Sequence, residues 1–378
     1  MSKLNCLAAK RLGDYIGQRT LRNSDLQYGA DLIEGVNNSG VFCRSKACTD
    51  GINLSPYKIV QHGDFVYNPS RLNLGSLAYR TGKMCIVSHL YVVFYLTEYG
   101  KKYILPEYLL IFFRRNEFYR LVNYRNFGSQ RPEFNFKKLS DIPIYIPSIE
   151  EQEKIVAAWK SLRAMKEQNE AMSEPLFALC RSRLQEMQKV YSKVILGDYI
   201  VQSDIRNSEN TYTVDAVMGI SIEKKFIRTK ADMTGVSLAP YKIIPPGYFG
   251  FVTVTSRNGE KISLAYNESN GIYIVSSSYE VFQVTKKEEL LPDFLFLVFQ
   301  QKEFDRYARF NSWGSARETF SFDEMCRVKI PLPPLAVQKA LVDIYRCAAE
   351  AKRIAEEADR LSREICPALL QHAVRGDN

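Results

Sequence analysis

An arginine stands close behind a Gly-Ser turn at two places in the chain, and these residue types together can bind an anion. FGSQRPEFNF covers residues 127–136 and WGSARETFSF covers residues 313–322. A glycine turn exposes backbone N–H groups, and a neighbouring arginine can form paired hydrogen bonds with a phosphate or with the edge of a guanine. The two turns therefore supply the first candidate contact residues, which are Ser129, Gln130, Arg131, Ser315 and Arg317.

Other polar side chains occur in loops at equivalent places in the two halves of the chain. The segments before the two turns contribute Arg125, Asn126, Arg309 and Asn311, the Ser-Arg pairs after a β-rich run contribute Arg71 and Arg257, and the early loops contribute Arg44, Lys46, Arg228 and Lys230. For any one of these residues, the alternative is a solvated or salt-bridged surface side chain. The aromatic residues around the turns are predicted to be core residues rather than base-stacking ones; they are Phe127, Phe134, Phe136, Trp313, Phe320 and Phe322.

Motifs for bond-breaking chemistry are missing from the sequence. Neither GxxxxGK[ST] nor GxGxxG occurs. The NPSR segment at residues 68–71 approaches the Asn-Pro-Pro-aromatic motif of amino-methyltransferases but lacks the second proline and the aromatic ring that would stack on a flipped base. We interpret it as a turn that ends a strand. The 8 cysteines form no CxxC and the 3 histidines stand apart, which predicts buried free thiols rather than a metal site.

The elements that must position these residues are repeated along the chain. LGDYIGQRTLRNSDLQY (residues 12–28) and LGDYIVQSDIRNSENTY (residues 196–212) share 10 of 17 positions, and further matching segments follow in the same order. In each half, short β-rich runs are separated by Gly, Pro and Asn turns. One helix is predicted next, over residues 106–124 or 292–310, with a proline in its first turn. Each half is therefore predicted to form a mixed α+β globule.

Each globule is followed by a long helical pattern. Apolar residues recur three or four positions apart at Ile155, Trp159, Leu162, Met165, Met172, Leu176 and Leu179, and again from Leu341 through Ala348, Ala351 and Ala358 to Leu369. Helices of roughly 40 residues, about 60 Å long, with so narrow an apolar stripe require a partner helix. We expect the two helices to pack antiparallel as a coiled-coil spacer with pseudo-two-fold symmetry, and Pro175 to kink the first. The predicted boundaries are 1–148 and 191–334 for the globules, and 149–190 and 335–378 for the helices.

The charge of the chain is concentrated in its first part. The net charge is +9 over 378 residues, and residues 1–140 alone carry 20 Lys and Arg against 10 Asp and Glu, whereas residues 191–330 carry 17 of each kind. A basic first globule predicts a polyanionic partner. No run of 18 apolar residues and no secretory signal is visible, so we expect a cytoplasmic protein without a membrane span.

The repeated segments resemble a known family. GDFVYNPSRLNLGS, IVSHLYVVF, FGSQRPEFNF and IPLPPLAVQ before a long helix, with the closing LLQHAVRGDN, are similar to the specificity subunits of type I restriction–modification systems. The resemblance covers both halves of the chain. It implies two target-recognition domains joined by a helical spacer, with Arg, Lys, Asn and Gln side chains at base edges and most of the affinity from phosphate contacts.

The same resemblance implies the partners of the chain. These would be double-stranded DNA with a bipartite site, two methyltransferase subunits and two restriction subunits that combine motor and nuclease. The chain would have no catalysis and no cofactor of its own, whereas its partners would use S-adenosylmethionine, ATP and Mg. Half-sites on one face of DNA lie about 34–36 Å apart per helical turn, which a spacer of about 60 Å can accommodate.

Two alternatives remain open from the sequence. One is the recognition subunit of a restriction–modification enzyme of another type that uses the same domains. The other is a duplicated coiled-coil adaptor that does not bind DNA. Salt-sensitive DNA binding separates the second alternative from the others.

Overall fold

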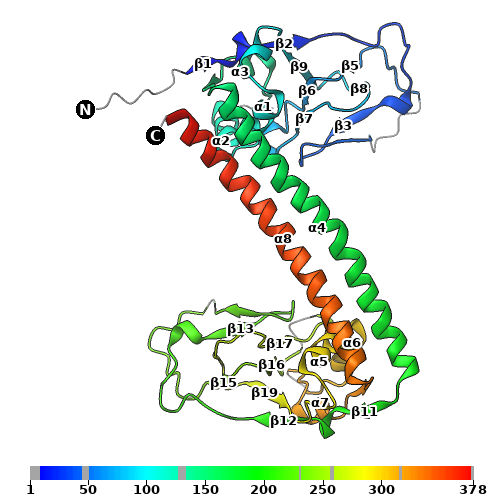
Figure 1. Ribbon diagram of the computed structural model, residues 1–378, viewed down its shortest axis with the longest axis vertical. Helices are drawn as coiled ribbons and strands as arrows, with labels where there is room; N and C mark the ends of the chain where they lie inside the picture. Colours follow the sequence, from blue (N-terminus) through cyan, green and yellow to red (C-terminus); the bar gives the residue numbers. More distant parts are fainter. Residues whose placement is uncertain are drawn as a thin grey trace. The chain divides into compact units, whose positions relative to one another are not determined.

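The computed structural model describes residues 9–44, 51–126, 133–229, 231–255, 259–314 and 317–375. The chain divides into two compact units (Figure 1). The first unit comprises the chain up to Asn169 together with the part from Arg353, and the second unit comprises Glu170–Lys352. Each unit therefore contains one globule and one half of each long helix.

The first globule consists of short strands and helices and ends where the first long helix begins. Its elements are β1 (Lys10–Arg11), η1 (Leu12–Asp14), β2 (Ile16–Arg19), η2 (Ala30–Leu32), β3 (Glu34–Val36), β4 (Phe42–Arg44), β5 (Lys58–Val60), β6 (Asp64–Tyr67), η3 (Leu72–Leu74), β7 (Leu77–Tyr79), β8 (Cys85–Val87), β9 (Val92–Leu96), η4 (Gly100–Lys102), α1 (Pro106–Phe113), α2 (Asn116–Arg125), α3 (Phe136–Ser140), β10 (Pro143–Ile144) and α4 (Ile149–Val190).

The second globule repeats this order almost element for element. Its elements are β11 (Lys193–Ile195), η5 (Leu196–Asp198), β12 (Ile200–Ser203), η6 (Val214–Ala216), β13 (Met218–Ile220), β14 (Phe226–Arg228), β15 (Lys242–Ile244), β16 (Tyr248–Val252), β17 (Leu264–Tyr266), β18 (Tyr273–Val275), β19 (Tyr279–Val284), α5 (Pro292–Phe299), α6 (Lys302–Phe310), α7 (Phe322–Cys326), β20 (Lys329–Pro331) and α8 (Leu335–Arg375).

Both globules have the same sheet topology and the same aromatic core. An antiparallel sheet has the order β2-β9-β6-β7 in the first and β12-β19-β16-β17 in the second. Phe65 lies opposite Phe94 in one sheet, and Phe249 lies opposite Phe282 in the other, with stacked rings whose centroids are 5.0 and 4.9 Å apart. These rings are fully buried. The mixture of helices and sheets confirms the α+β class, and the matching strand orders confirm the duplication that the sequence predicts.

Each predicted single helix is in fact two helices, so the prediction of one helix was wrong. The break falls at Arg115 and at Gln301, which have extended backbones with ψ of 145° and 143°. Arg115 Nε donates a hydrogen bond to Phe112 O at 3.1 Å, and Gln301 Nε2 donates to Leu297 O at 3.3 Å. In each case the side chain donates to a carbonyl in the last turn of the helix, where the next helical turn is missing; Leu297 O also accepts from Gln300 N at 3.3 Å.

The long helix α4 runs without interruption from Ile149 to Val190, so Pro175 does not break it; a kink at Pro175 stays a prediction. Pro175 has no N–H for the carbonyl of Ala171, but both residues are exposed, so water can bind that carbonyl. On the other side of the helix, Cys180 and Leu184 are buried in the core of the second unit. This packing holds the helix in register across the proline.

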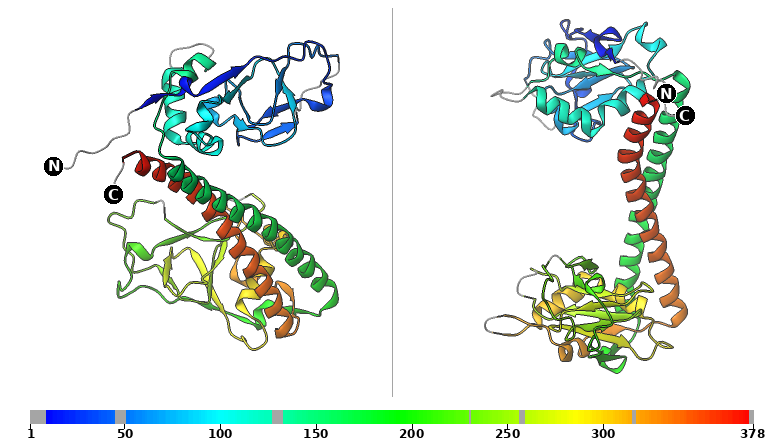
Figure 2. Two further views of the ribbon diagram at one scale, coloured as in Figure 1. Left: turned by 45° about the horizontal axis from the view of Figure 1, so that its top comes forward. Right: turned by 90° about the vertical axis from the view of Figure 1, so that its left-hand side faces the viewer.

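The two long helices pack against each other within each unit (Figure 2). In the first unit, Lys166 of α4 forms an ion pair with Asp359 of α8 at 2.8 Å. In the second unit, the ring of Phe177 lies 5.4 Å from that of Tyr345, and Cys180 Sγ lies 4.0 Å from Leu341 O. Residues 166, 177 and 180 of α4 thus contact residues 359, 345 and 341 of α8, in that order. Because the residue numbers rise along one helix and fall along the other, the helices run antiparallel as predicted.

The packed face of α4 differs in part from the predicted stripe, whereas that of α8 follows it. Met165, Met172 and Leu179 are 47%, 49% and 40% exposed. The alanines of the predicted stripe on α8, Ala348, Ala351 and Ala358, are buried as predicted, and Ser173 and Ala355 are buried as well, all with at most 3% exposed. Small residues allow two helix backbones to approach closely, so long methionine and leucine side chains are directed outward.

A buried glutamine joins each globule to its long helix. Gln152 Oε1 accepts a hydrogen bond from Leu105 N at 2.9 Å, while its Nε2 donates to Tyr103 O and Pro147 O at 2.7 and 3.0 Å. Gln338 makes the equivalent bonds in the second unit. Both side chains are fully buried, so every polar group of the amide has a partner inside the protein.

Candidate nucleic-acid interface

In the second unit, the Gly-Ser turn is attached to the loop that follows β16. Trp313 and Thr319 exchange backbone hydrogen bonds of 3.1 and 2.9 Å, which close the turn. Thr255 N donates to Glu318 O at 3.0 Å, and Phe320 N donates to Thr253 O at 2.8 Å. Two loops that are about 60 residues apart in the sequence therefore lie side by side, and each contains candidate contact residues.

The first unit attaches the equivalent loop in the same way. Phe134 N donates to Pro69 O at 3.1 Å, and the buried Tyr67 hydroxyl donates to Phe134 O at 2.9 Å. The side chain of Asn68 accepts from Ser70 N at 3.0 Å, so the NPSR segment is a turn that ends β6. Seven of the predicted contact residues lie outside the described residues; they are Lys46, Ser129, Gln130, Arg131, Lys230, Arg257 and Ser315.

Three of the predicted contact residues are held by internal hydrogen bonds. Arg125 donates to the carbonyls of Lys138 and Asp141, both at 3.3 Å, and Asn126 Oδ1 accepts from Lys138 Nζ at 2.9 Å. Asn311 Nδ2 donates to Tyr307 O at 2.9 Å. These side chains stabilise the ends of α2 and α6, so they are engaged before any ligand binds.

Arg309 and Arg317 differ in what they contact. Arg309 forms an ion pair with Glu318, both about 40% exposed. The sequence leaves open that Arg317 braces its turn against Glu318, but that carboxylate pairs with Arg309 instead. Arg317 is exposed and has no hydrogen bond or ion pair with any residue that the structure describes. Its guanidinium keeps its hydrogen-bonding capacity for a ligand.

Two further arginines lie at the ends of equivalent hairpins. Arg44 ends β4, paired with β3, and Arg228 ends β14, paired with β13. In each unit the hairpin lies at the end of the globule away from the three short helices (Figure 1). Arg44, Arg228 and also Arg71, next to η3, are exposed and have no partner within the described parts of the chain. With Arg317, they are the predicted cations that can neutralise phosphates.

Other arginines of the first globule form ion pairs inside it and cannot contact DNA phosphates. Arg80 forms paired hydrogen bonds of 2.8 and 3.0 Å with Glu34, and Arg19 pairs with the buried Asp64 at 2.7 Å. Burial raises the pKa of Asp64, while its hydrogen bond with Arg19 acts in the opposite direction. These ion pairs remove equal numbers of positive and negative charges, so the first globule keeps its excess positive charge while Arg19 and Arg80 themselves are not available to a ligand.

Trp313 contradicts the prediction that the aromatic residues of the turns belong to the core. Phe134 and Phe320 are fully buried as predicted, and Phe136 and Phe322 pack partly buried against the cores. Trp313, however, is 61% exposed. Phe127, its equivalent in the first unit, lies outside the described residues.

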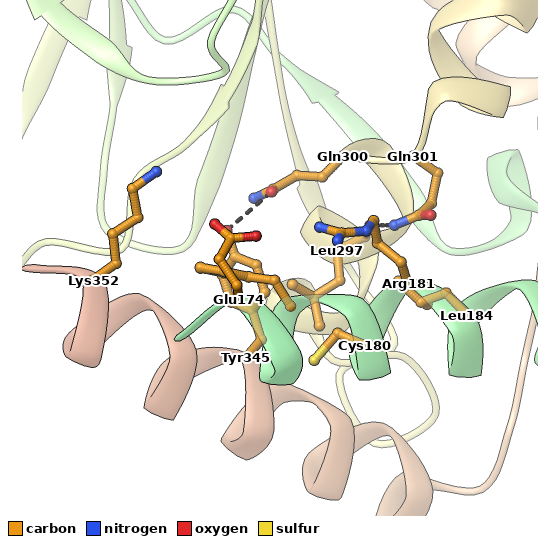
Figure 3. A pocket seen from close by; sticks show the side chains of 10 residues that line it. Glu174, Cys180, Arg181, Leu184, Leu297, Gln300, Gln301, Tyr345 and Lys352 are labelled. Carbon is orange, nitrogen blue, oxygen red and sulfur yellow. Dashed lines mark hydrogen bonds between the residues drawn. The ribbon is translucent and has the colours of Figure 1, made fainter. Parts of the chain in front are cut away.

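The second unit also contains a cavity of about 310 Å³ between α4, α5 and α8 (Figure 3). The Tyr345 hydroxyl donates a hydrogen bond to Gln300 Oε1 at 2.9 Å, and Cys180, whose pKa is raised by burial, also lines the cavity. In the first unit the equivalent pair is Arg114 and Trp159, with the guanidinium carbon 5.6 Å from the ring centroid. The two contacts join each globule to the helices with different chemistry.

Features of membrane and metalloproteins are not found in the part of the chain that the structure describes. Within it, no helix has both the length and the hydropathy needed to cross a bilayer. Nor do three or more His, Cys, Asp or Glu side chains gather there in a way that could hold a metal ion. The candidate surface thus consists of arginines, polar loops and an exposed aromatic ring.

Comparison with known proteins agrees with the duplicated architecture. The family described as "Type I restriction modification DNA specificity domain" matches residues 14–173 and again residues 199–346. The S subunit of a type I restriction–modification system from M. genitalium has the same fold, with a TM-score of 0.60 at 11% identity over 100% of this chain and 98% of that chain. No curated protein matches the sequence.

Two further solved structures are similar at lower scores. The HsdS subunit from Thermoanaerobacter tengcongensis is 17% identical over 100% of this chain and 99% of that chain, with a TM-score of 0.41. A chain from a type I R-M system is 16% identical over 100% of both chains, with a TM-score of 0.45. Since the family matches both halves, the chain belongs to the type I restriction–modification DNA specificity family and is a DNA target-recognition subunit with two copies of the specificity domain.

Proposed function

We propose that the chain recognises a bipartite site in double-stranded DNA, with one half-site bound by each globule. The observation that supports this proposal is that both globules share the same buried hydrogen bonds, whereas their exposed loops differ in sequence. Asn23 and Asn207 are buried and make matching bonds to Tyr28 and Tyr212, as Gln152 and Gln338 do to their own segments. A shared scaffold with unlike loops suits two different short sequences.

The chain would act as the non-catalytic part of a larger complex. Two methyltransferase subunits and two motor-nuclease subunits would carry out methylation and cleavage, using S-adenosylmethionine, ATP and Mg. Family membership supports this assignment, as does the absence of a catalytic motif from the sequence. The four exposed arginines, Arg44, Arg71, Arg228 and Arg317, would contact phosphates or guanine edges.

The proposal is tested by measuring the affinity for DNA, and its dependence on salt, for the original chain and for Arg317→Ala. Affinity is measured by fluorescence anisotropy with the methyltransferase present, at several salt concentrations. If Arg317 contacts phosphate, affinity should fall for all sequences and the slope of log K against log salt should decrease by about 1. If it contacts a base, binding should weaken by about 1–3 kcal/mol with relaxed choice at one position.

The matched control is Arg327→Ala, which removes an exposed arginine that pairs with Glu324 within α7 and its cap. This variant should bind DNA like the original chain. Binding that is absent, or that does not respond to salt in the original chain, would contradict the proposal and favour an adaptor that does not bind DNA. Normal affinity of Arg317→Ala would remove only this residue from the interface.

A further inference from the structure

An exposed aromatic surface lies beside the Gly-Ser turn of the second unit. Phe310, the last residue of α6, is 79% exposed, and Trp313 is 61% exposed. We propose that Trp313, supported by Phe310, stacks on a base that is unstacked from its neighbours in the bound DNA. This inference rests on the proposed DNA-binding function and adds a specificity-determining residue to it.

The exposure of these rings is not explained by the packing of their own unit. Along α6, Phe304 and Ala308 are buried against the core, whereas Phe310 lies two positions after Ala308 and so on the other side of the helix. The first unit repeats the arrangement, because Tyr124 near the end of α2 is 80% exposed. A large ring left in water at the same place in both copies indicates a surface that a ligand covers.

Trp313 is also held rigidly at the base of its turn. Besides the two backbone bonds with Thr319, the Thr319 hydroxyl lies 3.3 Å from Trp313 O. Gly314 has φ of +139°, and a side chain there would collide with the carbonyl of Arg317. The turn is in addition tied to the loop after β16 through Thr255, whose N and hydroxyl both donate to Glu318 O. The backbone that carries the indole is therefore fixed before a ligand binds, so that only the side-chain torsions of Trp313 remain to be ordered.

The charge around the rings favours a nucleic acid over a protein as the occupant. Arg317 is exposed and has no partner among the described residues, and Arg306 on α6 is exposed as well. The only carboxylate that belongs to the turn, Glu318, is neutralised by Arg309. An aromatic face beside free guanidinium groups is the combination that stacks bases while it holds the phosphate backbone.

The chain contains 2 tryptophans, which permits a direct test. Trp159 is 8% exposed, and Trp159→Phe leaves Trp313 as the single tryptophan of the chain. The emission of Trp159→Phe minus that of Trp159→Phe/Trp313→Phe, each with the methyltransferase, isolates Trp313 from tryptophans of the partner. The probes are a duplex with the motif found methylated in the host genome and a duplex of random sequence.

We expect the emission of Trp313 to be strongly quenched when the motif duplex binds, since a stacked base quenches an indole. Trp313→Ala should weaken binding to the motif roughly tenfold to a hundredfold, the size of one lost base–aromatic stack, while Trp313→Phe should retain most of the affinity. Phe310→Ala should have a smaller effect of the same kind. Both rings are exposed, so these variants should melt like the original chain.

Anisotropy on the same samples separates this inference from the function on which it rests. Saturated binding to the motif with unchanged Trp313 emission would overturn the stacking and leave DNA recognition intact. A change in emission when the methyltransferase is added before DNA would also overturn it, because the ring would then contact the partner protein. Loss of DNA binding in the original chain would overturn both.

Discussion

Replacing Asp305 with alanine should lower the free energy of unfolding of the second unit by about 3–5 kcal/mol, because it leaves a buried cation without its partner. Lys224 Nζ lies 2.6 Å from Asp305 Oδ1, and the two side chains are only 8% and 11% exposed. The same carboxylate accepts a hydrogen bond from Ile262 N at 3.3 Å. Burial lowers the pKa of Lys224, and the hydrogen bond with Asp305 opposes that shift.

The first unit has no Lys–Asp ion pair at the same place, where Arg114 instead donates a hydrogen bond to Gly40 O at 3.3 Å. Gly40, at φ +69°, stands where the second unit has Lys224 at φ +58°, and Tyr119 stands where it has Asp305. Lys224→Gly/Asp305→Tyr removes both buried charges together, so it should recover part of the stability that Asp305→Ala loses, and the glycine also suits the left-handed backbone. Urea unfolding measures the loss, and hydrogen exchange locates it. A loss below about 1 kcal/mol for Asp305→Ala would show that water reaches Lys224.

Gln338→Met should destabilise the second unit by about 2–3 kcal/mol, since it takes a fully buried amide from three backbone groups, of which one is buried and two are partly buried. The amide of Gln338 bonds to Leu291 N, Glu289 O and Pro333 O at 2.7–2.9 Å. Methionine has a similar length but no amide group. The loss of stability therefore measures the missing hydrogen bonds and not a cavity left by a smaller side chain. The Leu291 amide should also exchange faster with solvent.

Two variants control for this effect. Gln152→Met should produce the same loss in the first unit, with faster exchange at Leu105 in place of Leu291. Lys339→Met changes the next residue of α8, which is exposed, and should leave stability unchanged. If Gln338→Met melted like Lys339→Met, the glutamine would not be what joins the globule to the helix.

The architecture could be predicted because the sequence contains repeated patterns. The duplicated segments predict two similar globules, and the apolar spacing predicts two long helices. Local hydrogen bonds decide the details that were missed. The side chains of Arg115 and Gln301 end the helices α1 and α5 without any proline or glycine as a signal. The continuity of α4 through Pro175 depends on packing by Cys180 and Leu184 elsewhere in the fold.

The candidate site was less predictable, because a sequence shows which residues are polar but not what they contact. From the sequence, Arg125 and Asn311 were predicted to be loop residues available to DNA, but their side chains donate hydrogen bonds to nearby carbonyls. Arg309 takes the carboxylate that could have held Arg317. The exposure of Phe310 did have a signal, since it lies off the apolar face of its helix, whereas that of Trp313 depends on the pairing of its turn with Thr319.

Methylation-aware sequencing after a domain exchange tests whether each globule recognises one half-site. Residues 1–140 are replaced by the corresponding domain of another specificity subunit, the hybrid is expressed with the methyltransferase, and the methylated motif of the host genome is determined. We predict that one half of the motif changes completely while the other half is retained. A motif that changes in both halves, or that does not change at all, would contradict recognition of one half-site by each domain.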